Sequence, residues 1–226
     1  MIPPGRHIIL CCDCEGTRDE LSRMADAIDA AGVVANYFFV GDTVRAFPDV
    51  VRSIADRHQV ESHTMTHPNL RTLSKSAQRR EIMDGKAAVE DCIGRRTRGF
   101  RAPYHCLNRD TVEILNEEGF TFDASGLYFR YRMGAVQELT PSWFREWMPL
   151  YDWLRLSPET GWGVFRQIVR LRQVSLLPAH PQYSGRDAEL VRGFGGFLRW
   201  AKNDAGARFW TIDEWLCETR GVALPP

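Results

Sequence analysis

The sequence predicts a single α/β domain in which helices cover a parallel β-sheet that is either open or closed into a barrel. Strand-like and helix-like segments alternate along the chain. This order is typical of parallel sheets, because each helix carries the chain back to the start of the next strand. The length of 226 residues suits one hydrophobic core, and no repeat or Pro/Ser-rich linker divides it.

The first two strands and the helix between them have the clearest boundaries. Residues 7–13 form an apolar run that predicts a buried strand. Thr17 and Glu20 have the spacing of a capping box, which opens a helix that we expect to end at Gly32. Residues 33–40 are again apolar and predict the second strand.

The same alternation continues to the C-terminus. Ser74 and Asn108 are predicted N-caps of helices that end at Gly94 and Gly119. The other predicted helices are residues 42–56, 186–202 and 213–217, and the other predicted strands are residues 59–62, 98–101, 120–123, 174–179 and 208–212.

Composition excludes several classes of protein. Hydrophobic residues make up 44% of the chain and charged residues 26%, which fits a globular protein without a transmembrane segment. Lys+Arg and Asp+Glu are both 29, so no net charge attracts nucleic acid. The first residues lack the features of an export signal, so we expect a cytoplasmic protein whose six cysteines are reduced thiols.

An aromatic-rich insertion at about residues 128–165 interrupts the regular pattern, with 10 of the 25 aromatic residues. One interpretation is a helical excursion that packs on the barrel. The other is a wall or lid over the functional site that touches a hydrophobic or lipid-linked substrate. The residues expected to pack in the first case are Trp143, Trp147, Leu150 and Tyr151.

Acidic and imidazole side chains follow two of the predicted strands. Residues two apart in an extended chain point the same way, so Asp13 and Glu15 should project two carboxylates into one cavity. His63 and His67 share a face if the segment after residue 62 turns helically. Two imidazoles and one carboxylate, with positions open for water, are typical of a catalytic zinc site, and the other carboxylate stays available as a base. Alone, this histidine spacing also fits surface or capping residues.

Two further strand ends carry residues of possible catalytic use. Arg101 can orient a carboxylate through paired hydrogen bonds and so hold Asp13 as a base, or it is a surface arginine before a turn. His180 is placed to donate a proton to a departing amine, or it is a hydrogen-bonded core histidine.

Together and in this order, the segments resemble the polysaccharide deacetylase superfamily, also called the NodB-homology or carbohydrate esterase family 4 domain. The resemblance spans nearly the whole chain. Its motifs are Cys12-Asp13-Cys14-Glu15-Gly16, Ser62-His63-Thr64-Met65-Thr66-His67, Arg101-Ala102-Pro103-Tyr104 and Leu177-Pro178-Ala179-His180-Pro181. The segments 57–63, 120–125, 138–143 and 180–186 are similar to the branch that includes single-domain peptidoglycan deacetylases and allantoinase-like hydrolases.

The resemblance implies a distorted (β/α) barrel of about seven parallel strands formed by residues 1–226 as one domain. It also implies a divalent metal, with Zn²⁺ favoured and Co²⁺, Fe²⁺, Mn²⁺ or Ni²⁺ as alternatives. The implied metal ligands are Glu15, His63 and His67. The implied catalytic groups are the base Asp13, its orienting partner Arg101 and the acid His180, with substrate contacts at Tyr104 and Trp143.

Two departures from the family pattern affect the site. Most members have adjacent acids in the first motif, whereas Cys14 separates Asp13 from Glu15 here. The Asp and Trp of the family's fourth motif have no clear equivalent, so the residue that orients His180 is unassigned.

The implied activity is hydrolysis of a non-peptide carbon–nitrogen bond, as in N-deacetylation of a small or lipid-linked amino-sugar substrate. Three alternatives stay open. A cyclic imide or ureide hydrolase would use the same cavity, a non-haem Fe(II) oxygenase would use the same kind of ligand set, and a catalytically silent carbohydrate-binding module would keep only the pocket. The sequence leaves the oligomeric state and the acyl group open.

Overall fold

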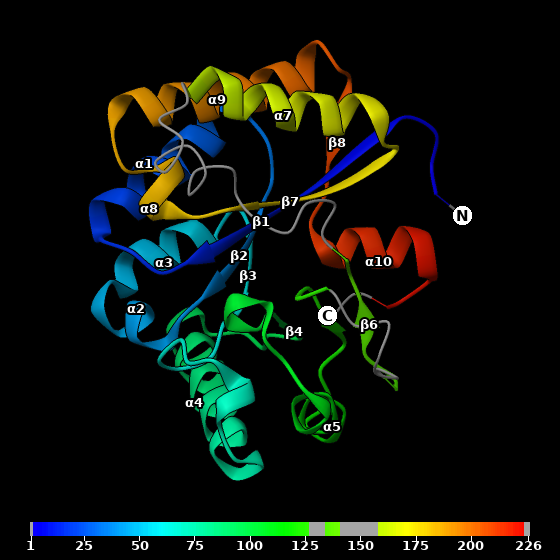
Figure 1. The fold of residues 1–226 in the computed structure, drawn as a ribbon. Coiled ribbons are helices and arrows are strands. Elements are labelled where there is room, and N and C mark those ends of the chain that lie inside the picture. Colours follow the sequence, from blue (N-terminus) through cyan, green and yellow to red (C-terminus); the bar gives the residue numbers. More distant parts are fainter. Residues whose placement is uncertain (1, 127–133, 141–157, 224–226) are drawn as a thin grey trace.

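The computed structural model describes residues 2–126, 134–140 and 158–223 and shows one curled parallel sheet surrounded by helices (Figure 1). The strands follow the order β6-β5-β4-β3-β2-β1-β7, and β8 pairs with the start of β1. Every strand pair is parallel. The predicted α/β class and the distorted barrel are confirmed.

Each of the seven predicted strands is present, and an eighth joins the sheet. β6 is only two residues long and pairs with β5, and no alternation of apolar residues marks it in the sequence. The strands are β1 (Arg6–Cys14), β2 (Asn36–Phe39), β3 (Gln59–Ser62), β4 (Gly99–Phe100), β5 (Phe122–Asp123), β6 (Gln137–Glu138), β7 (Val174–Ala179) and β8 (Ala207–Phe209).

The predicted helices are present, with one division and small shifts at the ends. Residues 42–56 form two helices, because Phe47 leaves the helical conformation and Pro48 starts the second one at a position where its missing N–H costs nothing. The helices are α1 (Arg18–Ala31), α2 (Gly41–Ala46), α3 (Pro48–Ala55), α4 (Lys75–Ile93), α5 (Arg109–Glu117), α7 (Pro158–Leu171), α8 (Pro181–Ser184), α9 (Ala188–Asn203) and α10 (Ile212–Arg220), with short 3-10 turns at Leu70–Thr72 and Pro103–His105.

The sequence signals for helix ends hold in the structure. Thr17 and Glu20 form both hydrogen bonds of the capping box at the start of α1, and Gly32 ends the helix in the left-handed conformation. Ser74 and Asn108 cap α4 and α5 through their side chains. Caps are local, so they can be read from neighbouring residues alone.

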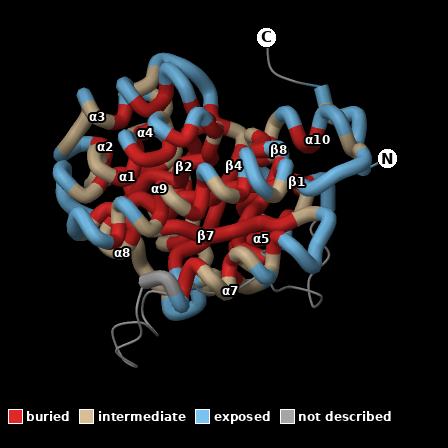
Figure 2. The backbone as a smooth tube through the Cα atoms, turned by 90° about the horizontal axis from the view of Figure 1, so that it is seen from above, coloured by how far each residue is buried: buried red, intermediate tan, exposed pale blue. Residues whose placement is uncertain are grey.

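Strand β1 separates two apolar layers. Its residues Leu10 and Cys12 pack outward against the surrounding helices, whereas Ile9 and Cys11 face the barrel interior. Figure 2 shows this arrangement as buried strands at the centre, enclosed by helices whose outer sides are exposed. The six cysteines all lie in the described residues, and each retains its thiol. The same alternation that buries these residues carries Asp13 to the interior at the end of the strand.

The amino ends of the strands are closed by α10. The Asn36 side chain at the start of β2 donates to the carbonyls of Leu10 and Trp210 and accepts from Ile212 N–H. Gln59 at the start of β3 accepts from Asp213 N–H at 3.0 Å. These hydrogen bonds satisfy the first N–H groups of α10. The predicted site residues lie at the opposite end of the barrel, where the strands have their carboxyl ends.

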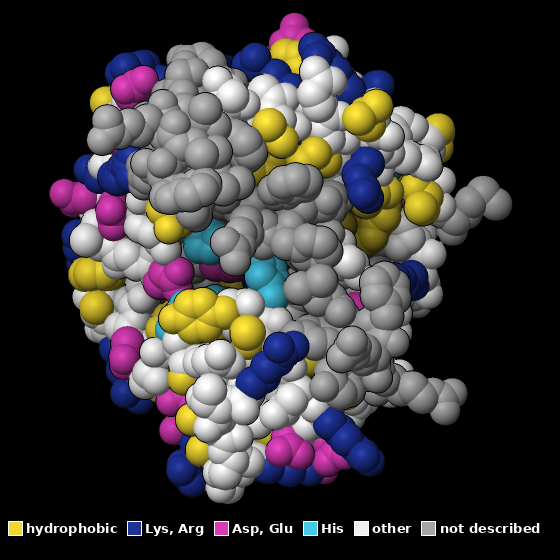
Figure 3. All heavy atoms as spheres, in the orientation of Figure 1, with side chains coloured by type: hydrophobic (Ala, Val, Ile, Leu, Met, Phe, Trp, Pro, Cys, Tyr) yellow, Lys and Arg dark blue, Asp and Glu magenta, His cyan; other side chains and the backbone are white. Residues whose placement is uncertain are grey.

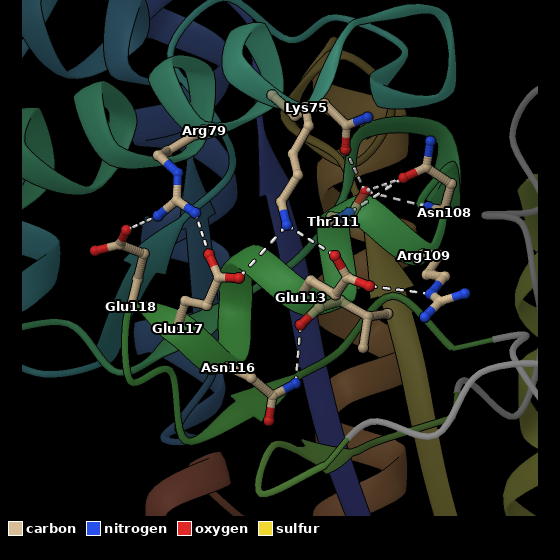
Figure 4. A network of polar contacts seen from close by, with 11 residues as sticks. Lys75, Arg79, Asn108, Arg109, Thr111, Glu113, Asn116, Glu117 and Glu118 are labelled. Atoms are coloured by element: carbon tan, nitrogen blue, oxygen red, sulfur yellow. Dashed lines mark hydrogen bonds and ion pairs between the residues drawn. The ribbon is translucent and has the colours of Figure 1, made fainter.

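Helices α4 and α5 are joined by a polar network at their exposed side (Figure 4). Lys75 donates to Glu113 at 2.7 Å and Arg79 pairs with Glu117 and Glu118. Beneath these ion pairs, Thr111 Oγ1 donates to the buried Gln78 at 2.6 Å. The pair of helices packs under β4 and supports the segment that carries Arg101.

Part of the aromatic-rich insertion lies in a helix. Trp162 on α7 is buried against Phe165, Phe194 and Phe197, as expected of a core residue. The predicted packing of Trp143, Trp147, Leu150 and Tyr151 falls outside the described residues. Within the described part of the chain, no helix has the length and apolar character needed to cross a membrane.

Candidate active site

The predicted site residues meet because parallel strands end at the same edge of the sheet. Asp13 lies at the end of β1, and His63, Arg101 and His180 directly follow β3, β4 and β7. In the space-filling view, histidine and acidic side chains gather near the middle of one face, beside a hydrophobic patch (Figure 3). The sheet therefore brings together residues that are up to 167 positions apart in the sequence, as the contact between Glu15 and Gln182 shows.

Asp13 forms a buried ion pair with Arg101. Arg101 Nε lies 2.6 Å from Asp13 Oδ1, and the arginine side chain is fully inaccessible to solvent. Burial acts to raise the pKa of Asp13, but the Arg101 guanidinium and the neighbouring imidazoles outweigh it and hold that pKa well below its ordinary value. Asp13 is therefore ionised at neutral pH and has a fixed orientation, two properties that a general base needs.

Glu15, His63 and His67 form a cluster with the donor set of a metal site. One ligand atom from each side chain lies within 4.8 Å of the others, and it is the one cluster of this kind in the described residues. His63 Nδ1 lies 2.7 Å from Arg101 O, where it donates its proton, so Nε2 keeps the lone pair that a metal requires. Burial lowers the pKa of His63 to about 4, which keeps the imidazole neutral above that pH.

The chemistry of these donors fits a divalent cation. Glu15 Oε2 and His67 Nε2 are only 2.5 Å apart, and Gln182 donates to the other Glu15 oxygen at 2.8 Å. Burial acts to raise the pKa of Glu15, but contacts with His67 outweigh it and lower that pKa. An ionised carboxylate and two imidazoles make up the ligand set of catalytic zinc sites that keep a position open for water.

The two histidines converge by a route that differs from the expected helical turn. The segment after Ser62 is a loop in which Thr64 and His67 have left-handed φ angles of 66° and 61°. The backbone of a residue other than glycine is strained in this conformation, so the loop needs support from its surroundings. Glu81 on α4 supplies it by accepting from the backbone N–H groups of Met65 and Thr66. The two imidazoles therefore lie together, 5.0 Å between ring centroids, without a helical turn.

Tyr104 and His105 continue the segment after Arg101 into the site. Tyr104 is 63% exposed, and its ring makes an edge-type contact with the His67 ring, 4.7 Å between centroids. His105, which the sequence analysis did not single out, donates through Nδ1 to Ser125 O. Burial and then the charge of Arg101 lower the pKa of His105 to about 4. The feature of the sequence that could have pointed to His105 is its position directly after Tyr104. The other predicted substrate contact, Trp143, is outside the described residues.

His180 lies beside Asp13, at the end of the neighbouring strand β7. Its Nε2 lies 3.5 Å from Asp13 Oδ2, and the Tyr183 ring stands edge-on to the imidazole. Asp13 thus lies between Arg101 and His180, beside the three-donor cluster. Gln182, a contact of Glu15 that the sequence did not reveal, follows His180 by two residues.

Comparisons with known proteins agree with this architecture. The profile of the family "Polysaccharide deacetylase" matches residues 2–122. A peptidoglycan-N-acetylglucosamine deacetylase, PgdA, from Listeria monocytogenes is 32% identical over 133 residues, which are 58% of this chain and 28% of that protein. A chitooligosaccharide deacetylase from Rhizobium leguminosarum bv. trifolii is 34% identical over 85 residues, which are 37% of this chain and 40% of that protein. The first curated relatives are matched over 32% to 44% of their own length.

A solved structure shares the fold over almost the full chain. The family 4 carbohydrate esterase from Streptomyces lividans, crystallised with acetate, superimposes with a TM-score of 0.70 at 18% identity and 98% coverage of both chains. Since the family profile covers more than half of the sequence, this chain belongs to the polysaccharide deacetylase family, a family of hydrolases that act on carbon–nitrogen bonds other than peptide bonds.

Proposed function

We propose that this protein is a metal-dependent hydrolase that removes the N-acetyl group from an amino-sugar substrate. The observation that carries this proposal is the position of Asp13, an ionised carboxylate held by Arg101 beside the donor cluster of Glu15, His63 and His67. A binding module has no need for a buried base next to a metal site. The names of the Listeria and Rhizobium relatives, both deacetylases of N-acetylated sugars, indicate the substrate class.

The residues have complementary tasks in this reaction. Glu15, His63 and His67 would hold the cation, which when bound supplies Lewis-acid polarisation of the amide carbonyl and a more acidic water. Asp13 accepts a proton from the water as its oxygen bonds to the acyl carbon. His180 donates a proton to the amine nitrogen as the carbon–nitrogen bond breaks. The products are acetate and the free amine.

The segment after Arg101 contributes to binding in this proposal. The exposed Tyr104 ring offers an apolar surface beside His67 on which a sugar ring can pack, and the backbone N–H of Tyr104 can donate to the developing oxyanion. Trp143 is proposed as a second substrate contact. A small or lipid-linked amino sugar and a Zn²⁺ ion are the substrate and the cofactor that we consider first.

The direct test is acetate release by metal-free protein with and without added Zn²⁺. We expect metal-dependent release of acetate from N-acetylated chitooligosaccharides or peptidoglycan fragments, and much slower ring opening of allantoin and hydantoin. Faster ring opening would instead establish a cyclic ureide hydrolase. Absence of turnover on every substrate by metal-loaded protein would refute the proposal and favour a silent sugar-binding module.

The metal assignment has its own test. The double variant His63→Ala/His67→Ala should lose stoichiometric metal in elemental analysis, because two of three donors are removed. His180→Ala is the matched control, since it removes an imidazole from the site but none from the donor cluster. It should keep the metal and lose activity. Equal metal content in both variants would contradict the assignment.

A further inference from the structure

The turn after β5 fixes the segment that carries Arg101. Arg101 Nη1 donates to Ala124 O at 2.6 Å, and Ala102 N–H donates to Ser125 Oγ at 2.7 Å. Arg101 uses its Nε for Asp13. The Arg101 guanidinium is therefore held by the turn through Nη1 and contacts Asp13 through Nε. A shift of the turn would move the group that orients the proposed base.

Asp123 anchors this turn. Its Oδ1 accepts from Ser125 Oγ at 2.7 Å and its Oδ2 accepts from Ser125 N–H at 3.2 Å. The Asp123 side chain is completely buried at the end of β5. Directly opposite in the parallel register lies Glu138 of β6, and side chains at opposed positions project to the same side of a sheet.

Asp123 and Glu138 form a buried pair of carboxyl groups. Neither oxygen of Glu138 is accessible to solvent, and the two carboxyl groups are close enough to share a hydrogen bond when one of them is protonated. Two ionised carboxylates in such a place would repel, so the contact is favourable only when one proton is shared. Burial and then the charge of Asp123 raise the pKa of Glu138 well above its ordinary value. Asp123 accepts two hydrogen bonds from Ser125, which favour its ionised form, so the proton lies on Glu138.

We propose that Glu138 is a positioning residue, a buried carboxylic acid whose hydrogen bond to Asp123 holds the β5 turn and, through it, Arg101 in the geometry that orients Asp13. This role rests on the proposed function of Asp13. In this role Glu138 is held in place by β6, a strand of two residues at the edge of the sheet. Arg101 is near enough to both carboxyl groups for its charge to act on each.

The first test compares two substitutions at one position. Glu138→Gln keeps a neutral side chain with a donor for Asp123, whereas Glu138→Leu removes the donor at similar size. We expect Glu138→Gln to retain kcat within about threefold and Glu138→Leu to lose at least about tenfold in kcat with little change in KM, because a misplaced base slows the chemical step. Ser125→Ala, which interrupts the connection further along, should resemble Glu138→Leu and serves if that variant folds poorly. Equal kcat values for the Gln and Leu variants would overturn the inference.

The second test does not depend on catalysis. The Nε–H of Arg101 gives a ¹⁵N-correlated NMR signal that can be assigned by its absence in Arg101→Lys. We expect the same signal in wild type and Glu138→Gln, and a shifted or exchange-broadened signal in Glu138→Leu. An unchanged signal in all three proteins would overturn the positioning role. If wild-type protein proves inactive while the signal behaves as expected, the proposed function fails and the structural connection from Glu138 to Arg101 stands.

Discussion

Asp13 and Glu15 show how one strand end gives two neighbouring carboxylates different properties. Asp13 is buried and contacts the Arg101 guanidinium, which is always positively charged, so Asp13 is ionised and has little freedom to move. Glu15 is partly exposed and contacts His67 and Gln182 instead. The residue that separates them, Cys14, points into the outer apolar layer. The alternation of an extended chain predicted that both carboxylates project to the same side, and the family resemblance implied their different roles. The contact with Gln182 depends on a segment far away in the sequence.

Asp13 is the residue whose replacement should affect the reaction most. We expect Asp13→Asn to lower kcat by at least about a hundredfold, since general base catalysis typically contributes that much or more. Metal content should stay at the wild-type level because Asp13 is outside the donor cluster. Kinetics on an N-acetylated substrate, with circular dichroism to verify folding, measure both effects. A variant that keeps half of the wild-type rate would exclude Asp13 as the base.

His105 should make stability depend on pH. Its pKa of about 4 in the folded chain lies below the ordinary value of 6.5, so the unfolded chain binds the proton more tightly. The stability that neutral His105 contributes is complete above pH 6.5 and is lost as the pH falls toward 4, by at most about 1.4 kcal/mol per pH unit.

His105→Asn is the suitable variant for this prediction, because asparagine tolerates the left-handed φ of 54° at this position. Urea denaturation at pH 7, 6 and 5 gives the free energy of unfolding of both proteins. The advantage of the wild type over His105→Asn should shrink at each lower pH. A constant difference would contradict the lowered pKa.

At the scale of elements, the ends of helices could be predicted from the sequence, whereas the strand with which each strand pairs could not. The ends of α1, α4 and α5 follow from caps such as Thr17, Ser74 and Asn108, which act within a few residues. β6 has no local signal, because two residues give no periodicity and their pairing with β5 is decided by the folded sheet. The conformation of the loop that presents His63 and His67 could not be predicted for the same reason, since its support comes from Glu81 on α4.

Helix α5 allows a comparison of two kinds of polar contact. We expect Asn108→Ala to lower the free energy of unfolding by about 1 kcal/mol, because it leaves amides at the helix start without a partner. Arg79→Ala removes the ion pairs drawn in Figure 4 and should cost less, since exposed pairs are screened by solvent. Urea denaturation in low and high salt distinguishes them: only the Arg79→Ala effect should depend on salt. A larger loss for Arg79→Ala than for Asn108→Ala would contradict this ranking.

At the scale of the whole molecule, the site could be predicted from the sequence because the strands of a parallel sheet all end at the same edge. Strands that run parallel collect their final residues at one edge, so motifs that follow β1, β3, β4 and β7 had to converge once the class was right. The interactions that hold the site, such as the contact of Asp123 with Glu138, join neighbouring strands whose order cannot be read from residue spacing alone.

Metal binding should stabilise the folded chain as a whole. The donors Glu15, His63 and His67 come from two segments that are separate in the unfolded chain, so the cation binds the folded state preferentially. We expect the Tm to rise on addition of Zn²⁺ and to fall on addition of EDTA. The double variant His63→Ala/His67→Ala should show neither shift, and a wild-type Tm that is indifferent to both additions would contradict the site.

The central claim is that one divalent cation binds beside Asp13 without using it as a ligand. Anomalous diffraction at the zinc absorption edge, on crystals grown with Zn²⁺, tests this claim most directly. The account predicts a single strong peak at about 2.0–2.2 Å from an oxygen of Glu15 and the Nε2 atoms of His63 and His67, with Asp13 beyond bonding distance. A peak bonded to Asp13 in place of Glu15, or no peak at this cluster, would contradict it.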